Sequence, residues 1–201
     1  MKFTKTKIAA FAIAISSAVS LLPAYAGGLP VRNCTWCHGV SAQGYTPAPR
    51  LAGQRYQYIE HQLMSFARHR RDNPFSKMYM WYAAGNLNRE TAHTLAIYLS
   101  SLHPKAASDG NMLLVGLGRT IFQQGLPESN IVACVACHGP KAQGVREIPR
   151  LGGLSYSYLQ SRLEQWNEGY DAGALFPMPH VASTLSPRQV DALASYLSFI
   201  K

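Results

Sequence analysis

Apolar residues recur at helical spacing in two stretches of the chain, one in each half. In the second stretch Ser186 can cap a helix, Pro187 suits its first turn and Gln189 closes a capping box. The apolar residues that share one face are Ala92, Leu95, Ala96 and Leu99 in the first stretch and Val190, Leu193, Ala194 and Leu197 in the second. These patterns predict two amphipathic helices, one starting at Asn88 and the other at Ser186.

A further apolar-periodic segment precedes each of these helices. Its members are Tyr58, Ile59, Gln62, Leu63 and Phe66 in the first half and Tyr158, Leu159, Leu163 and Trp166 in the second. Residues 111–125, NMLLVGLGRTIFQQG, add a helix on which Gly118 and Phe122 lie one turn apart. No segment shows the sustained two-residue alternation of a strand, so we predict an all-α fold with almost no sheet.

The first residues have the pattern of an export signal. Three lysines precede an apolar run over residues 8–22, and the triplet Ala-Tyr-Ala at residues 24–26 suits signal peptidase. The run is shorter than the roughly 20 apolar residues that a membrane-spanning helix needs, which disfavours the alternative of a retained anchor. We therefore expect a signal peptide over residues 1–26 and an exported, periplasmic mature protein that starts at Gly27.

The mature chain repeats itself. Residues 48–63, APRLAGQRYQYIEHQL, match residues 148–163, IPRLGGLSYSYLQSRL, at a shift of 100 positions. The two last helices match at a shift of 98 positions. The sequence thus predicts two homologous domains, residues 27–104 and 109–201, joined near the linker-like segment HPKAASDG at residues 103–110.

Each half carries one Cys-x-x-Cys-His-Gly motif, and these motifs contain all four cysteines of the chain. Paired cysteines in an exported protein could form disulfides, a redox dithiol or part of a zinc site. The histidine that follows directly is instead typical of covalent haem attachment, with two thioethers and the histidine as an iron ligand. We predict two covalently bound haem c groups. Their attachment residues are Cys34, Cys37, Cys134 and Cys137, and their iron-binding histidines are His38 and His138.

A methionine in the second half is a candidate for the sixth iron ligand. Met178 lies between Pro177 and Pro179, in a segment that we expect to be a stiff loop and not helical through Pro179. His180 is the rival ligand.

In the first half both Met78 and Met80 are candidates. Met80 precedes Leu87 by seven residues, as Met178 precedes Leu185, so we favour Met80 while Met78 stays an alternative. Methionine ligation raises the reduction potential of haem iron and closes its sixth position. This arrangement favours electron transfer over catalysis at iron.

Two repeated residue pairs suit the surroundings of a haem. Pro49 and Pro149 each lie eleven residues after the iron-binding histidine of their half, and their carbonyls can accept from its ring N–H. Arg50 and Arg150 follow directly and are candidates for pairing with the haem propionates through the planar guanidinium.

Charge is distributed unevenly along the mature chain. Residues 27–108 hold nine basic and three acidic residues, whereas residues 109–201 hold seven of each. A basic half beside a neutral half indicates an oriented docking surface for redox partner proteins, at least one of them acidic or membrane-bound. Peripheral membrane association is compatible with this pattern. Nucleic acid is a poor partner for an exported chain whose one basic run, residues 68–71, we interpret as a solvated helix face.

These motifs resemble those of the dihaem cytochromes c, most closely the cytochrome c4 family. The similar elements are the paired haem motifs, the Pro-Arg-Leu-x-Gly segments and a methionine seven residues before each last helix. The resemblance implies two class I cytochrome c domains related by a pseudo-twofold axis, with haem propionates that meet near the domain interface. It also implies a periplasmic carrier between a quinol-oxidising complex or a dehydrogenase and a terminal oxidase. Related dihaem chains are subunits of flavin-containing sulfide dehydrogenases, which is the alternative function.

One departure from that family concerns the start of the mature chain. The second half has the helix that normally precedes the haem motif, but only residues 27–33 precede Cys34, and they cannot form such a helix. The apolar face of the helix over residues 88–102 then needs cover from the other domain or from a partner. A haem enzyme is disfavoured, because peroxidases of similar organisation are longer and need an open iron. Thiosulfate-oxidising cytochromes use a cysteine ligand that this chain cannot supply.

Overall fold

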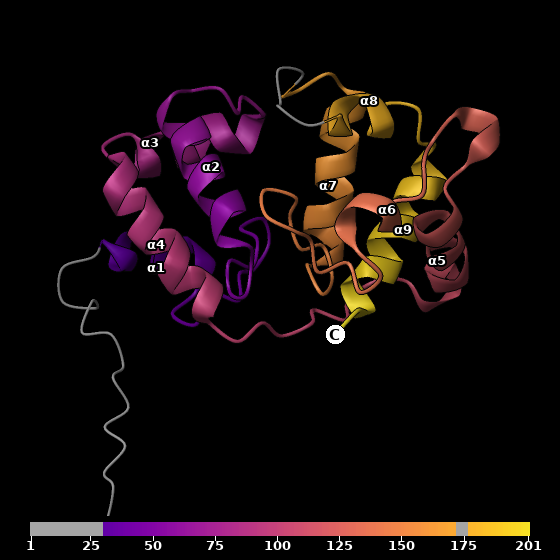
Figure 1. The fold of residues 1–201 in the computed structure, drawn as a ribbon, viewed down its shortest axis with the longest axis horizontal. Coiled ribbons are helices and arrows are strands. Elements are labelled where there is room, and N and C mark those ends of the chain that lie inside the picture. The colour runs from indigo at the N-terminus through magenta and orange to yellow at the C-terminus, as the bar shows by residue number, and fades with distance from the viewer. Residues whose placement is uncertain (1–29, 172–176) are drawn as a thin grey trace, which may run out of the picture.

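The computed structural model describes residues 30–171 and 177–201, which form two helical halves side by side (Figure 1). The predicted signal peptide, residues 1–26, lies outside the described residues. Helices of the N-terminal half are α1 (Val31–His38), α2 (Tyr56–Ala67), α3 (Trp81–Ala84) and α4 (Arg89–Ser101), with a π-helical turn at Ser76–Met80. Those of the C-terminal half are α5 (Val115–Gln124), α6 (Val135–His138), α7 (Tyr156–Asn167), α8 (Met178–Ala182) and α9 (Pro187–Phe199), with 3₁₀ turns at Met112–Leu114 and Pro127–Ser129. Over the described residues the only β-type pairings are isolated bridges, so the predicted all-α fold is confirmed.

The predicted caps set the starts of the last helix of each half. The Asn88 side chain accepts from Thr91 N at 2.8 Å, and α4 begins directly after it. Ser186 and Gln189 form the predicted capping box at the start of α9. All eight residues of the two predicted apolar faces are buried.

The expectation of a non-helical loop through Pro179 is wrong. Met178 and Pro179 form the first turn of α8, which follows Pro177. Proline is tolerated there because the N–H groups of a first helical turn have no partner within the helix. The proline therefore fixes where this helix starts and does not prevent it.

Each half packs its last helix against its middle helix, and the C-terminal half adds a third layer. The N-terminal core lies between α2 and α4, and the C-terminal core between α7, α9 and α5. At the crossing of α5 and α9, a Cβ atom on Gly118 would lie 1.9 Å from Ala192 O. One turn further along α5, the Phe122 ring packs 5.6 Å from that of Tyr196. Only glycine permits so close a crossing.

The halves meet along an interface flanked by α2 and α7 (Figure 1). Asp72 and Asp171 bind each other's backbone: Asp171 Oδ1 accepts from Asp72 N at 2.7 Å, and Asp72 Oδ1 accepts from Asp171 N at 2.9 Å. Such reciprocal contacts between repeat-related residues are those of a pseudo-twofold arrangement.

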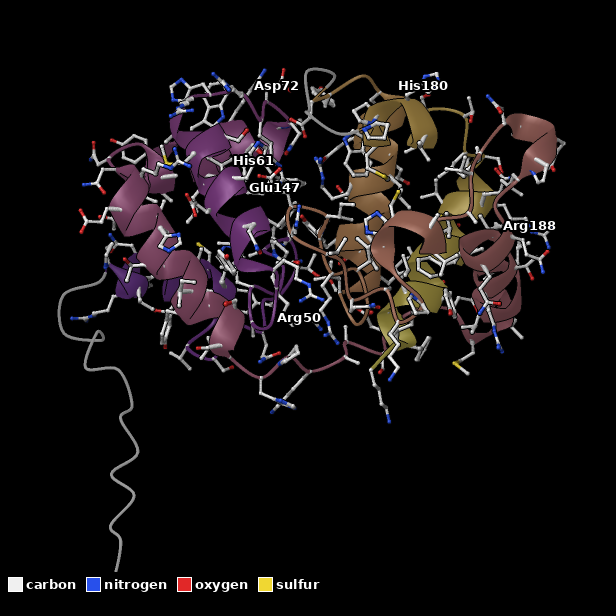
Figure 2. The ribbon with its side chains drawn as sticks, viewed as in Figure 1. Arg50, His61, Asp72, Glu147, His180 and Arg188 are labelled. Carbon is white, nitrogen blue, oxygen red and sulfur yellow. The ribbon has the colours of Figure 1, made fainter. Side chains whose placement is uncertain are left out.

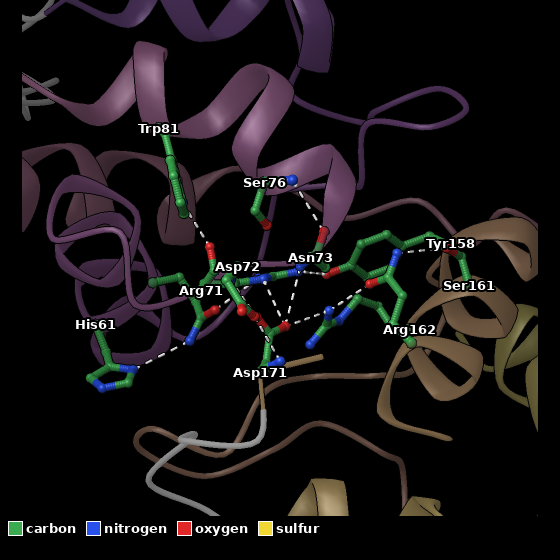
Figure 3. Close-up of polar contacts among 12 residues, drawn as sticks. His61, Arg71, Asp72, Asn73, Ser76, Trp81, Tyr158, Ser161, Arg162 and Asp171 are labelled. Carbon is green, nitrogen blue, oxygen red and sulfur yellow. Dashed lines mark hydrogen bonds and ion pairs between the residues drawn. The ribbon is translucent and has the colours of Figure 1, made fainter. Parts of the chain in front are cut away.

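The interpretation of residues 68–71 as a solvated helix face is wrong. Helix α2 ends at Ala67, before this run begins. Arg68 and Arg70 are exposed, but the side chain of Arg71 is only 11% exposed and turns into the domain interface (Figure 3). The carboxylate of Asp171, 3.9 Å from Arg71 Nε, and the hydrogen bond that Arg71 Nη2 donates to Tyr158 Oη at 3.4 Å offset its loss of water.

The connection between the halves, residues 102–111, has no helix. The domain limits 27–104 and 109–201 stay a prediction. In the described part of the chain, no helix combines the length and the apolar character needed to cross a membrane.

Candidate functional site

Two histidines lie in equivalent positions, each at the end of a helix that starts at or before the second cysteine of its pair. His38 ends α1 and His138 ends α6, and both are buried, with exposed fractions of 6% and 4%. His38 Nδ1 lies 2.7 Å from Pro49 O, and His138 Nδ1 lies 3.0 Å from Pro149 O. These are the contacts that the eleven-residue spacing predicts, and they leave Nε2 of each ring for a metal.

The glycine that closes each haem motif region brings the proline carbonyl to the histidine. Gly44 donates its N–H to His38 O at 2.8 Å and has a φ of 74°. A Cβ on Gly44 would lie 2.5 Å from Pro49 C, so a side chain would push the proline segment away. Gly144 has the same role beside His138 and Pro149. This geometry explains why Ala-Gln-Gly recurs after both haem motifs.

Burial favours the neutral form of both rings. Loss of water lowers the pKa of His38 and His138, and the hydrogen bond to each proline carbonyl offsets only part of this effect. A neutral imidazole that donates from Nδ1 presents a lone pair at Nε2, which is the form that binds iron.

The cysteines are placed for thioether attachment. None of the four is in a disulfide within the described residues; Cys34 and Cys134 are half-buried, and Cys37 and Cys137 are exposed. Each pair shares a short helical segment with its histidine, as covalent haem attachment requires.

Both predicted methionine ligands are half-buried, and both rivals are exposed. Met80 ends the π-helical turn, whereas Met78 on the same turn is 64% exposed. Met178 packs against the C-terminal core. His180 points outward at the edge of the C-terminal half (Figure 2). The burial pattern is consistent with Met80 and Met178 as ligands, and this assignment stays a prediction.

Arg50 lies in the domain interface (Figure 2). Its Nη1 donates to Lys105 O and Gly153 O, both at 2.6 Å, and its Nη2 donates to Gly152 O at 2.7 Å. Burial, and then the charge of Arg150, lowers its pKa to about 10, so it stays charged at neutral pH.

Three of the five N–H groups of Arg50 donate to these carbonyls, which leaves one on Nη2 and the one on Nε for a propionate. Arg50 Nε is buried without a hydrogen-bond partner among the described residues. Arg150 is less constrained, since its Nε donates to Gly152 O at 3.2 Å and it is only half-buried. The propionate roles of both arginines stay predictions.

The residues present fit two haem c groups. The donor set has a thiol pair, a neutral imidazole and a methionine in each half, and the orphaned Arg50 Nε suits an anionic propionate. When bound, each haem supplies reversible one-electron chemistry at iron.

The sequence repeat does not predict two polar residues of the interface, because the residues at the equivalent positions of the other half are different. Gln54, whose counterpart is Leu154, donates to Arg150 O at 2.9 Å and accepts from Arg150 N at 2.7 Å. Arg55, whose counterpart is Ser155, donates to Gln143 O and Gly144 O at 2.9 Å and 2.7 Å. The sequence does contain one indication of these contacts: both residues are polar, follow the repeated Pro-Arg-Leu-x-Gly segment and differ from their counterparts.

Comparison with known proteins agrees with this geometry. A sequence model of the family described as cytochrome c matches residues 29–103 and 115–201. The chain belongs to the cytochrome c family. Cytochrome c-552 of Acidithiobacillus ferridurans is 34% identical over 170 residues, covering 83% of this chain and 73% of that protein. A thiosulfate dehydrogenase electron acceptor of Stutzerimonas stutzeri is 36% identical over 173 residues, covering 82% and 77% respectively.

The fold of this cytochrome c also matches a solved structure of the predicted kind. Cytochrome c4 of Acidithiobacillus ferrooxidans superposes with a TM-score of 0.77 at 32% identity, covering 83% of this chain and 98% of that one. Two cytochrome c domains with two Cys-x-x-Cys-His motifs indicate two covalently bound haem c groups, at Cys34 and Cys37 and at Cys134 and Cys137. The protein is a dihaem, cytochrome c4-like electron carrier.

Proposed function

We propose that this cytochrome is a periplasmic carrier that moves single electrons between a respiratory donor and a terminal acceptor such as an oxidase. The proposed iron ligands are His38 and Met80 in one half and His138 and Met178 in the other. The observation that carries the proposal is the fixed histidine. Each ring is held through Nδ1 by a proline carbonyl, so its Nε2 keeps one orientation in both oxidation states.

The chain's own residues favour a small structural change on electron transfer. Buried neutral histidines and methionine thioethers exchange no proton when the iron changes charge. With the proposed methionine ligands, the sixth position of each iron is closed to small-molecule substrates, as a carrier requires.

Replacing the methionines tests the ligand assignment. We expect Met80→Ala and Met178→Ala each to remove about half of the methionine–iron charge-transfer absorption and to lower the reduction potential of one haem. The matched controls are Met78→Ala and His180→Ala, which should leave the spectrum and both potentials unchanged. Intact absorption in Met80→Ala together with its loss in Met78→Ala would reassign the ligand. High-spin haem in the unmodified protein would overturn the carrier function.

A second candidate is an electron-transfer subunit of a dehydrogenase complex, for which a flavin-dependent sulfide dehydrogenase is one example. The observation that favours it is the similarity to a thiosulfate dehydrogenase electron acceptor. Purification of the native protein at low and at high salt separates the two proposals. A stoichiometric second chain that survives high salt supports the subunit, and a single chain under both conditions supports the free carrier.

A further inference from the structure

The two halves differ most in the cover of their last helix. Ser195 on α9 is 0% exposed, whereas Ile97, which takes the same position on α4, is 45% exposed. The open face of α4, defined here as Thr94, Ile97, Tyr98 and Ser101, corresponds to Ala192, Ser195, Tyr196 and Phe199 of α9. Within residues 30–171 and 177–201, nothing takes the place on this face that α5 takes on α9.

The C-terminal half shows what kind of helix packs on the equivalent face of α9. Its cover is α5, a ten-residue helix on the side of the C-terminal half that faces away from the N-terminal half (Figure 1). It presents a glycine where it crosses Ala192 and an aromatic ring to Tyr196. The segment before α5 also binds α9: Gly110 N donates to Ser198 Oγ and Asn111 N donates to Ser195 Oγ, both at 3.1 Å.

The open face leads to the haem attachment segment of its own half. A groove between α1 and α4 is lined by Val31, Val40, Tyr98 and Leu102, and its other lining residues include Cys34 and His38. Two of these lining residues are assigned to haem attachment and iron binding, so a helix bound over the open face lies beside the haem-binding segment of this half.

Cleavage after Ala26, as the sequence predicts, leaves only Gly27, Gly28 and Leu29 ahead of the described residues, too short a segment to supply a cover like the ten residues of α5. Two exposed basic residues are near lining residues of the groove in sequence: Arg32 follows Val31, and Lys105 lies three residues after Leu102. Acidic Glu90 lies at the opposite end of α4.

We propose that the open face of α4 binds an amphipathic helix of an electron-transfer partner protein. This helix has a small residue where it crosses Thr94, an aromatic residue against Tyr98, and acidic side chains directed toward Arg32 and Lys105. The inference rests on the proposed carrier function, and it makes the N-terminal half the docking half. The docking surface is thus one face of α4 with a partner helix of defined shape, and not a general basic surface.

Site-specific photo-crosslinking in the native host tests the occupant. A benzophenone amino acid replaces Ile97 in the full-length holoprotein, and the matched control replaces Leu113, which is 92% exposed on the other half. We expect position 97, and not position 113, to form an adduct with a helical segment of a haem, copper or flavin protein. An adduct with a second copy of this chain, with its own residues 1–29 or with a protein that lacks a redox cofactor overturns the proposal. So does the absence of an adduct at position 97.

A charge substitution then tests whether that contact transfers electrons. With the crosslinked partner purified, we expect Ile97→Glu to slow electron exchange about tenfold at low protein concentration, while Leu113→Glu changes it less than about twofold. Equal rates for the wild type and Ile97→Glu overturn the proposal. Because both side chains are exposed, neither variant disturbs the core. The ligand spectra of the methionine variants test the carrier function separately.

Discussion

At the residue scale, repeated sequence spacing predicts contacts between residues that are close in sequence. It does not predict contacts that depend on the direction of a turn. The histidine–proline contacts follow from an eleven-residue spacing that occurs twice. The direction of Arg71 does not follow from composition, because helix α2 ends four residues earlier and the turn reverses the run of arginines into the interface. Charge patterns therefore locate exposed surfaces only where the helix limits are known.

The interface cluster around Asp171 gives a prediction at this scale. Its carboxylate lies 2.8 Å from Arg162 Nη1 and 3.9 Å from Arg71 Nε (Figure 3). Burial alone would raise the pKa of Asp171, but the charges of Arg162 and Arg71 outweigh it and hold this pKa below its usual value. A lowered folded-state pKa means that the stabilisation is complete above the unfolded value of about 4 and is lost as pH falls through the folded value.

We expect Asp171→Asn to lower the free energy of unfolding by about 3 kcal/mol at neutral pH, because two buried arginines lose their counter-charge. The same variant should lose less stability than the wild type between about pH 5 and pH 2. Denaturant unfolding at a series of pH values measures both effects. Asp191→Asn is the control, since Asp191 accepts only from Tyr156 and Gln160 of its own half. Parallel pH profiles for wild type and Asp171→Asn would contradict the assignment.

At the element scale, caps and apolar spacing predict where the long helices start, but they do not predict the short helical turns. Helices α4 and α9 begin at the predicted caps. The π-helical turn that ends at Met80 follows Asn73, whose side chain accepts from Ser76 N at 3.1 Å, but its apolar pattern is too short to predict a helix. Helix α8 begins at a position where Met178-Pro179 suggested a loop. A segment of five residues is too short to show a helical hydrophobic period. Whether it is helical therefore depends on how it packs against the rest of its half.

Helix α5 offers a matched pair of glycines for testing the crossing with α9. A Cβ on Gly118 would meet the backbone of Ala192, whereas a Cβ on Gly116 has nothing within 4 Å. We expect Gly118→Ala to lower the free energy of unfolding of the C-terminal half by about 2 kcal/mol through overpacking. Gly116→Ala should raise it by up to about 1 kcal/mol through helix propensity. Thermal unfolding followed by circular dichroism measures both, and two substitutions of equal effect would show that propensity alone governs this helix.

At the scale of the whole molecule, the repeat predicts two like halves but not how they are joined. Two of the joining residues, Gln54 and Arg55, differ from their counterparts in the other half, so the comparison of the two repeats does not reveal them. Pairing across an interface also depends on both surfaces at once, which periodicity along one helix does not encode. The two haem sites are held relative to each other by these polar contacts to backbone groups.

Gln54 tests whether these contacts couple the halves. Its side-chain amide binds both backbone groups of Arg150, and Gln54 is only 6% exposed. Gln54→Leu keeps the side-chain size and introduces the residue found at the repeat position, Leu154. It removes the partner of the part-buried N–H and C=O of Arg150 and of the N–H of Arg55. We expect a loss of about 3 kcal/mol. We also expect the single calorimetric transition of the holoprotein to split in two, because each half keeps its own core while their coupling weakens.

Gln43→Leu is the control for that experiment. The Gln43 amide makes the same two kinds of bond, to His103 O at 2.8 Å and Lys105 N at 2.9 Å, but both partners are exposed and neither belongs to the C-terminal core. Water can replace these bonds, so we expect a cost below about 1 kcal/mol and a single transition. Splitting in Gln54→Leu alone would show that the pair with Arg150 couples the two haem-binding halves. Splitting in neither variant, with the full loss of stability in Gln54→Leu, would mean that Arg50 and the Asp72–Asp171 contacts suffice to hold them together.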